Sequence, residues 1–69
     1  MLRLKELRED SDLTQSYIAK ILNISQRSYS HYELEDRQIP LDLLIKLADY
    51  YNVSVDYIIG RTNKKRREN

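Results

Sequence analysis

Two short helical patterns stand close together within residues 15–33 of this 69-residue chain. The apolar and small residues of each pattern fall on one face: Ile18, Ala19 and Leu22 in the first, and Tyr29 and Tyr32 in the second. Only Asn23, Ile24 and Ser25 separate them. Asn tolerates the left-handed conformation that ends a helix, and Ser accepts a backbone hydrogen bond at the start of the next. So short a break predicts two helices that cross steeply, with Ala19 allowing their close approach.

A helix, a short turn and a second helix at roughly 90 to 120° form a helix-turn-helix unit. The stretch LTQSYIAKILNISQRSYSHYE resembles the helix-turn-helix of the phage-repressor-like (Cro/C1, or XRE) DNA-binding domains. In that family a Gln opens the first helix, an Ala fills the crossing, and a Ser-Gln pair opens the recognition helix. The matching residues here are Gln15, Ala19, Ser25 and Gln26. The resemblance implies an all-α, compact, five-helix lambda-repressor-like domain over residues 1–60, followed by a basic flexible tail or linker start over residues 61–69.

Composition agrees with a small helical domain. A chain of this length buries only about 60% of its unfolded surface, so it forms one economical core. One Gly, one Pro and six Tyr as the only aromatic residues disfavour a turn-rich β fold. The absence of Cys fits a reducing cytoplasm, and the longest apolar run, Leu43 to Ile45, is too short to enter a membrane.

The charge is divided along the chain. Through Ile59 there are seven basic and ten acidic residues, whereas from Gly60 onward there are five basic and one acidic. An acidic body is poor support for non-specific attraction to phosphates, because that attraction grows with the number of phosphates neutralised. Cations that bind DNA must therefore be local to one face, with the basic tail contributing part of the attraction or forming a solvated end.

The first helix is expected over residues 2–10, with Leu4 and Leu7 facing inward. Arg8 lies on or beside this apolar stripe, either as a solvated charge or as a partner for a buried acid. The family resemblance implies that Arg8 forms a structural ion pair with Glu33, the residue that closes the recognition helix. Such a pair fixes the first helix against the third.

The candidate DNA-binding residues lie mostly on the outward face of the recognition helix. Gln pairs with adenine and Arg with guanine in the major groove, so Gln26 and Arg27 are the expected base readers. The resemblance implies that Gln15 contacts the DNA backbone and braces the recognition helix. Several further side chains are expected to contact phosphates or bases. The alternative for each of them is contact with solvent or with neighbouring residues only. They are Tyr17, Ser25, Ser28, Ser30, His31 and Arg37. His31 is the single histidine, so neither a metal site nor another cofactor is expected.

The sequence departs from the family just after this motif. In that family a Gly commonly stands two residues after the Glu that closes the recognition helix, which is Glu33 here. This chain has Glu35 at that position. Either Glu35 adopts a left-handed conformation at a cost of about 1 kcal/mol, or the turn differs and the third helix extends. The acidic Glu35 and Asp36 also weaken the attraction of Arg37 for phosphate.

Thr14 is the expected N-cap of the second helix, and Ser54 is that of a short fifth helix. A fourth helix is expected to start near Pro40, and the fourth and fifth helices both contribute to the core. The fourth helix presents Leu41, Leu44, Ile45, Ala48 and Tyr51 as its core residues. Tyr50, Tyr57 and part of Val55 or Ile59 are expected to stay exposed. The resemblance implies that the fifth helix and its surroundings form a homodimer contact, either in the free protein or only on DNA; the alternative is a monomer.

These features favour a sequence-specific regulator of transcription, of the repressor type, that binds two-fold symmetric double-stranded DNA in the cytoplasm. The chain is either a complete small repressor or the DNA-binding part of a longer one. The alternative is a protein-interaction module, such as an antitoxin that binds a partner protein and regulates its own promoter. An enzyme has little support, because the sequence contains no Cys, no glycine-rich phosphate loop and only one His.

Overall fold

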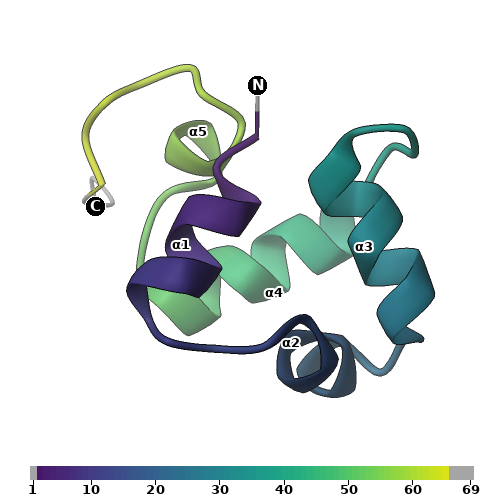
Figure 1. Cartoon of the computed structure of the whole chain (residues 1–69). Helices are drawn as coiled ribbons and strands as arrows, with labels where there is room; N and C mark the ends of the chain where they lie inside the picture. The colour runs from purple at the N-terminus through teal and green to yellow at the C-terminus, as the bar shows by residue number, and fades with distance from the viewer. Residues whose placement is uncertain (1, 66–69) are drawn as a thin grey trace.

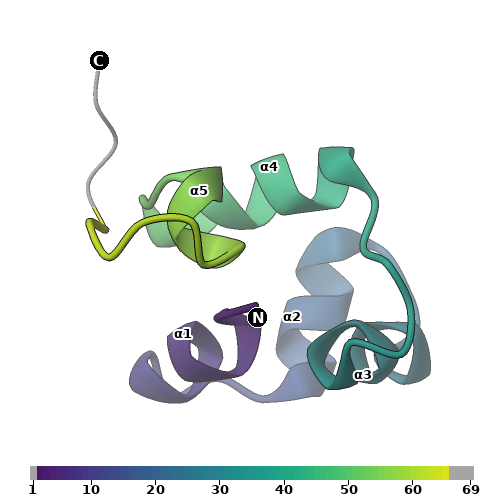
Figure 2. The same cartoon turned by 90° about the horizontal axis from the view of Figure 1, so that it is seen from above.

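The computed structural model describes residues 2–65, which form five helices and no strand. In chain order the helices are α1 (Leu4–Asp10), α2 (Gln15–Leu22), α3 (Gln26–Leu34), α4 (Leu41–Tyr51) and α5 (Val55–Ile58). Figure 2 shows α4 and α5 packed on one side of the molecule and α1, α2 and α3 on the other. The predicted all-α, five-helix fold is therefore confirmed.

Side-chain hydroxyl groups start three of the helices. Thr14 Oγ1 accepts a hydrogen bond from the Tyr17 N–H at the start of α2, and Ser25 and Ser54 do the same for α3 and α5. Each hydroxyl satisfies a backbone donor that has no partner within its own helix. The predicted N-caps are therefore confirmed.

The predicted start of the first helix is wrong by two residues, because α1 begins at Leu4. Arg3 precedes it as an N-cap without a side-chain cap, and its backbone N–H donates to the Ile58 carbonyl at 2.8 Å. This bond ties the beginning of the chain to α5 before the helix starts.

Left-handed residues end three helices. Asn23, Glu35 and Asn52 have φ angles of 59°, 62° and 56° at the ends of α2, α3 and α4. Asn occupies this conformation readily, whereas Glu has no side-chain feature that favours it. Of the two predicted alternatives for Glu35, the left-handed one is present, and α3 ends one residue beyond Glu33.

The core collects apolar side chains from all five helices, and Tyr29 is the largest fully buried one. On α4, however, the predicted stripe is wrong in two positions. Leu41 and Ile45 are 65% and 47% exposed, while Leu47, which the prediction omitted, is fully buried. The buried face of α4 is centred on Leu44, Leu47 and Ala48, so Leu41 lies at its end and Ile45 at its side.

Arg3 holds the chain that follows α5. Its guanidinium lies 4.3 Å from the centre of the Tyr57 ring and donates to the carbonyls of Tyr57 and Thr62 and to Asn63 Oδ1. The expectation that Tyr57 stays exposed is wrong, because this contact and the core leave it buried.

Residues 61–65 lie beside α5, at the opposite end of the molecule from α3 (Figures 1 and 2). Arg66 and Arg67 of the predicted basic cluster lie outside the described residues. The division of the chain at residue 60 stays a prediction. None of the helices within residues 2–65 has the length and apolar character needed to cross a bilayer.

Candidate nucleic-acid interface

The turn between α2 and α3 sets the geometry of the site. The Asn23 N–H donates to the carbonyls of Ala19 and Lys20, and the Ile24 N–H donates to Ala19 at 3.0 Å. The chain thus leaves α2 abruptly and enters α3 within three residues. Figure 1 views α2 nearly along its axis and α3 from its side, so the two helices cross steeply as predicted.

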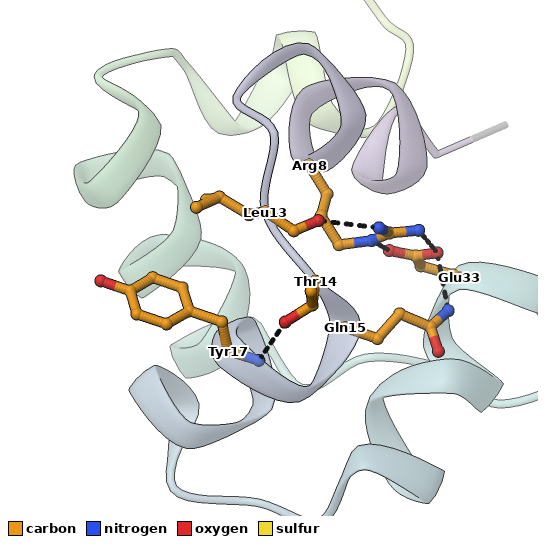
Figure 3. Close-up of polar contacts among 6 residues, drawn as sticks. All are labelled: Arg8, Leu13, Thr14, Gln15, Tyr17 and Glu33. Carbon is orange, nitrogen blue, oxygen red and sulfur yellow. Dashed lines mark hydrogen bonds and ion pairs between the residues drawn. The ribbon is translucent and has the colours of Figure 1, made fainter.

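A polar cluster anchors the inward side of α3 to α1. Arg8 Nε lies 2.7 Å from Glu33 Oε2, and Arg8 Nη2 donates to Glu33 Oε1 at 3.2 Å (Figure 3). The third bond of the guanidinium, from Nη1, goes to the Leu13 carbonyl at 2.9 Å. Both side chains are nearly buried, at 13% and 4% exposed. The ion pair implied by the resemblance is present, and it joins α1, α3 and the loop before α2.

Gln15 extends this cluster into the first turn of α2. Its Nε2 donates to Glu33 Oε1 at 3.0 Å, so Glu33 receives hydrogen bonds from both preceding helices (Figure 3). The predicted bracing contact of Gln15 is present. Its predicted contact with the DNA backbone stays a prediction.

The electrostatics of this cluster favour charged Arg8 and charged Glu33. Burial acts to raise the pKa of Glu33, but the hydrogen bonds from Arg8 and Gln15 hold that pKa below its usual value. The hydrogen bond to Glu33 likewise raises the pKa of Arg8. The pair therefore stays ionised over the whole neutral range.

Two tyrosine hydroxyls lie beneath the same cluster. The hydroxyl oxygens of Tyr29 and Tyr51 are buried and have no hydrogen-bond partner in geometric range among residues 2–65. Burial raises the pKa of Tyr51 to about 12 and that of Tyr29 further still. Both hydroxyls therefore stay neutral over the neutral pH range.

The outward side of α3 differs, because two polar side chains of its first turn have no partner in the described part of the chain. Gln26 and Arg27 are exposed and make no side-chain hydrogen bond or ion pair with any other described residue. Ser25 Oγ accepts from the Ser28 N–H at 3.1 Å and donates to Ser28 Oγ at 3.0 Å. The Ser28 hydroxyl proton therefore remains available to an external acceptor, whereas the Ser25 hydroxyl is used within the cap.

The later turns of α3 carry Ser30 and His31, both half-buried. His31 Nδ1 lies 2.8 Å from Asp36 Oδ1 in the loop after the helix. Sequence reasoning identified Asp36 only as an unfavourable charge and missed this contact. The sequence feature that could have indicated this contact is the position of Asp36, five residues after His31 and directly after Glu35, for which a left-handed turn is one expectation.

The remaining candidates lie away from this first turn. Tyr17 is exposed on α2, and Arg37 is exposed in the loop that follows α3. That loop begins at the opposite end of α3 from the α2–α3 turn (Figure 1). The structure thus brings Ser25, Gln26, Arg27 and Ser28 together and separates Arg37 from them. Across residues 2–65 no three His, Cys, Asp or Glu side chains gather in a way that suits a metal ion.

The sequence of this region matches known proteins. Residues 4–58 match the model of a family described as helix-turn-helix. The chain is 46% identical over 61 residues to the uncharacterized HTH-type transcriptional regulator YobD of Bacillus subtilis, covering 88% of this chain and 54% of that protein.

Two further relatives bear on function. The HTH-type transcriptional regulator ImmR of Bacillus subtilis is 44% identical over 59 residues, with 86% of this chain and 46% of that protein covered. Antitoxin PezA of Streptococcus pneumoniae is 37% identical over 57 residues, with 83% and 36% covered. The chain therefore spans about half the length of the two regulators. No solved structure matches it.

Proposed function

The chain belongs to the helix-turn-helix family, and we propose that it is a sequence-specific, double-stranded-DNA-binding transcription regulator of the repressor type that reads the major groove with α3. One observation carries the proposal. Gln26 and Arg27 are exposed and have no hydrogen-bond or ion-pair partner within residues 2–65, at the start of a helix whose opposite side is fixed by the Arg8–Glu33 pair. A rigid helix with free donors in its first turns is what base recognition requires.

Each exposed side chain has a role in this proposal. Gln26 pairs with an adenine and Arg27 with a guanine, since each offers two hydrogen-bonding groups with matching geometry. The Ser28 hydroxyl, Tyr17, Arg37 and the N-terminal turn of α2 at Gln15 contact phosphates, which position the helix without reading sequence. Occupying a promoter in this way requires no catalytic step.

A homodimer suits this function. A single helix of nine residues contacts few base pairs, and two copies about 34 to 36 Å apart read two half-sites one helical turn apart. We propose a two-fold symmetric operator and action in the cytoplasm, where that DNA lies. The resemblance assigns the dimer contact to α5 and its surroundings. The exposed large apolar side chains of the described residues instead lie on α2, α3 and α4, and the candidates on α4 are Leu41, Ile45 and Tyr50.

Selection of bound duplexes from a random pool, followed by a salt titration of the selected duplex, tests the proposal. We expect a two-fold symmetric consensus and an affinity that falls steeply with salt, because phosphate contacts release counterions. Arg27→Ala is expected to relax the base preference at one position of each half-site and to weaken the free energy of binding to the selected duplex by about 1–3 kcal/mol.

The matched control is Lys46→Ala, which removes the same charge from an exposed position on α4. It should leave the consensus unchanged. The proposal would be refuted if the unaltered protein selected no consensus sequence. It would also be refuted if Arg27→Ala and Lys46→Ala lost base preference equally.

A second function is favoured by the relation to an antitoxin. In this alternative the chain binds a partner protein and regulates its own promoter. Leu34 and Leu41 are exposed apolar side chains that such a partner would cover. Purification from the native host tests it, since an antitoxin should be recovered in a stoichiometric complex and a repressor should be recovered without one.

A further inference from the structure

The contact between His31 and Asp36 is unlike any other on the outward side of α3. His31 Nδ1 lies 2.8 Å from Asp36 Oδ1 and 3.1 Å from Asp36 Oδ2, so one ring nitrogen faces both oxygens of the carboxylate. Arg27 lies one turn before His31 on the same face of the helix. His31 is therefore placed beside a proposed base reader, with one nitrogen already occupied.

The chemistry of the two groups fixes where the ring proton lies. An ionised carboxylate only accepts hydrogen bonds, so the Nδ1 that faces it must carry a proton. A neutral imidazole has a single N–H, and the hydrogen bond at one nitrogen decides which nitrogen holds it. The neutral ring of His31 thus leaves Nε2 as an acceptor with no proton.

The left-handed Glu35 makes this contact possible. With a φ of 62° it turns the chain sharply after α3, and the next residue, Asp36, comes back to His31. The charged groups around the ring in the sequence are Arg27 and Glu35 on α3 and its cap, and Asp36 and Arg37 in the loop. Among these, only Asp36 has a hydrogen bond to the ring within the described residues.

We propose that Asp36 is a positioning residue for specificity: it holds His31 with Nε2 as an outward acceptor, and α3 thereby selects an adenine or cytosine at the base facing this ring. Those bases present an amino donor in the major groove, whereas guanine and thymine present acceptors there. This inference rests on the proposed function, because it assigns a base contact to the same helix. The negative charge of Asp36 thus weakens DNA binding in general, but through His31 it also determines which base is preferred.

Duplex selection at about pH 8 tests the proposal with Asp36→Ala and Glu35→Ala. Each variant removes one negative charge from adjacent exposed positions, so both should bind all duplexes more tightly to a similar extent. Only Asp36→Ala removes the acceptor of His31. We expect the unaltered protein and Glu35→Ala to share a consensus position at which A or C is favoured by about 3- to 10-fold, the value of one hydrogen bond. Asp36→Ala and His31→Ala should reduce that preference to nearly equal use of the four bases.

An unchanged preference in Asp36→Ala would overturn this inference while leaving the proposed function intact. Failure of the unaltered protein to select any consensus would overturn both. The imidazole ¹⁵N shifts of the free protein give an independent readout that needs no DNA. We expect Nδ1 to be protonated in the unaltered protein and in Glu35→Ala, and the proton to move toward Nε2 in Asp36→Ala. A ring protonated on Nε2 in the unaltered protein would overturn the inference.

Discussion

Both sides of α3 carry polar side chains, but those on the inward side are buried and hydrogen-bonded, whereas those at the start of the outward side are exposed. On the inward side, the carboxylate of Glu33 is nearly buried and receives hydrogen bonds from Arg8 and Gln15. On the outward side, Gln26 and Arg27 are exposed and unpaired with other described residues. Buried polar groups are tolerated only when their hydrogen bonds are satisfied, whereas groups that recognise a ligand must be left free.

This difference separates stability from recognition within nine residues. Changes on the inward side are expected to alter the free energy of unfolding, and changes on the outward side the affinity for DNA.

The largest expected effect comes from breaking the ion pair. Glu33→Ala or Arg8→Ala leaves the other charge nearly buried without its partner, so either should lower the free energy of unfolding by about 3–5 kcal/mol. The outward Arg27→Ala should change it by less than about 0.5 kcal/mol. Urea unfolding followed by circular dichroism measures all three.

The single variants of the pair could unfold at room temperature, because a small domain is only marginally stable. The double variant Arg8→Met with Glu33→Leu removes both charges and should recover much of the loss. Equal destabilisation by Arg27→Ala and Glu33→Ala would contradict the division between the two sides of α3.

The same comparison applies to α4. Leu47 is fully buried and Leu41 is 65% exposed, although both are leucines on one helix. We expect Leu47→Ala to cost about 2–5 kcal/mol through lost burial and a cavity, and Leu41→Ala to cost less than about 0.5 kcal/mol. Thermal unfolding of the two variants at low protein concentration compares them. A large loss for Leu41→Ala would show that this position is covered in solution.

Acid should weaken the inward side selectively. The pKa of Glu33 in the folded protein is below its usual value of 4.5, so the folded state favours the ionised carboxylate. Its contribution to stability is fully present above the unfolded pKa and is lost as the pH falls through the lower, folded pKa. The difference in free energy of unfolding between the unaltered protein and Glu33→Gln should therefore shrink on acidification below about pH 4.5. A constant difference down to that range and below would contradict the assigned role of Glu33.

The smallest expected effect is a gain in stability at the end of α3. Glu35 has a φ of 62°, and Gly adopts this conformation without the steric cost that a side chain incurs. Glu35→Gly should therefore stabilise the domain by about 1 kcal/mol, which corresponds to a rise in Tm of roughly 4–8 °C. Asn52→Gly, at the matching position of α4, should gain less because Asn already tolerates the conformation. A loss of stability in Glu35→Gly would contradict the strain assigned to this turn.

The parts of the fold that could be predicted from sequence are those decided by local chemistry. Thr14, Ser25 and Ser54 were identified as caps because a hydroxyl at a helix start has a specific backbone partner. The left-handed Asn23 was predicted for the same kind of reason. Arg8 and Glu33 are 25 residues apart, and only the resemblance to a known family, which the match over residues 4–58 confirms, indicated their pairing.

The parts that could not be predicted depend on distant packing. On α4 the near-continuous apolar residues from Leu41 to Leu47 fit more than one stripe, and only the placement of the other helices decides which face is buried. Tyr57 is covered by Arg3, which lies 54 residues earlier in the chain. The His31–Asp36 contact depends on the unusual backbone of Glu35, which no periodicity reveals.

The central claim, that the outward side of α3 contacts DNA while the inward side only holds it, is tested most directly by an NMR titration of the ¹⁵N-labelled protein with its selected duplex. We predict that the largest changes fall on the backbone and side-chain amides of residues 25–31, including the Gln26 amide and the Arg27 guanidinium, while the Arg8 guanidinium keeps its shift. Largest changes on α4 or α5, with residues 25–31 unaffected, would contradict the account.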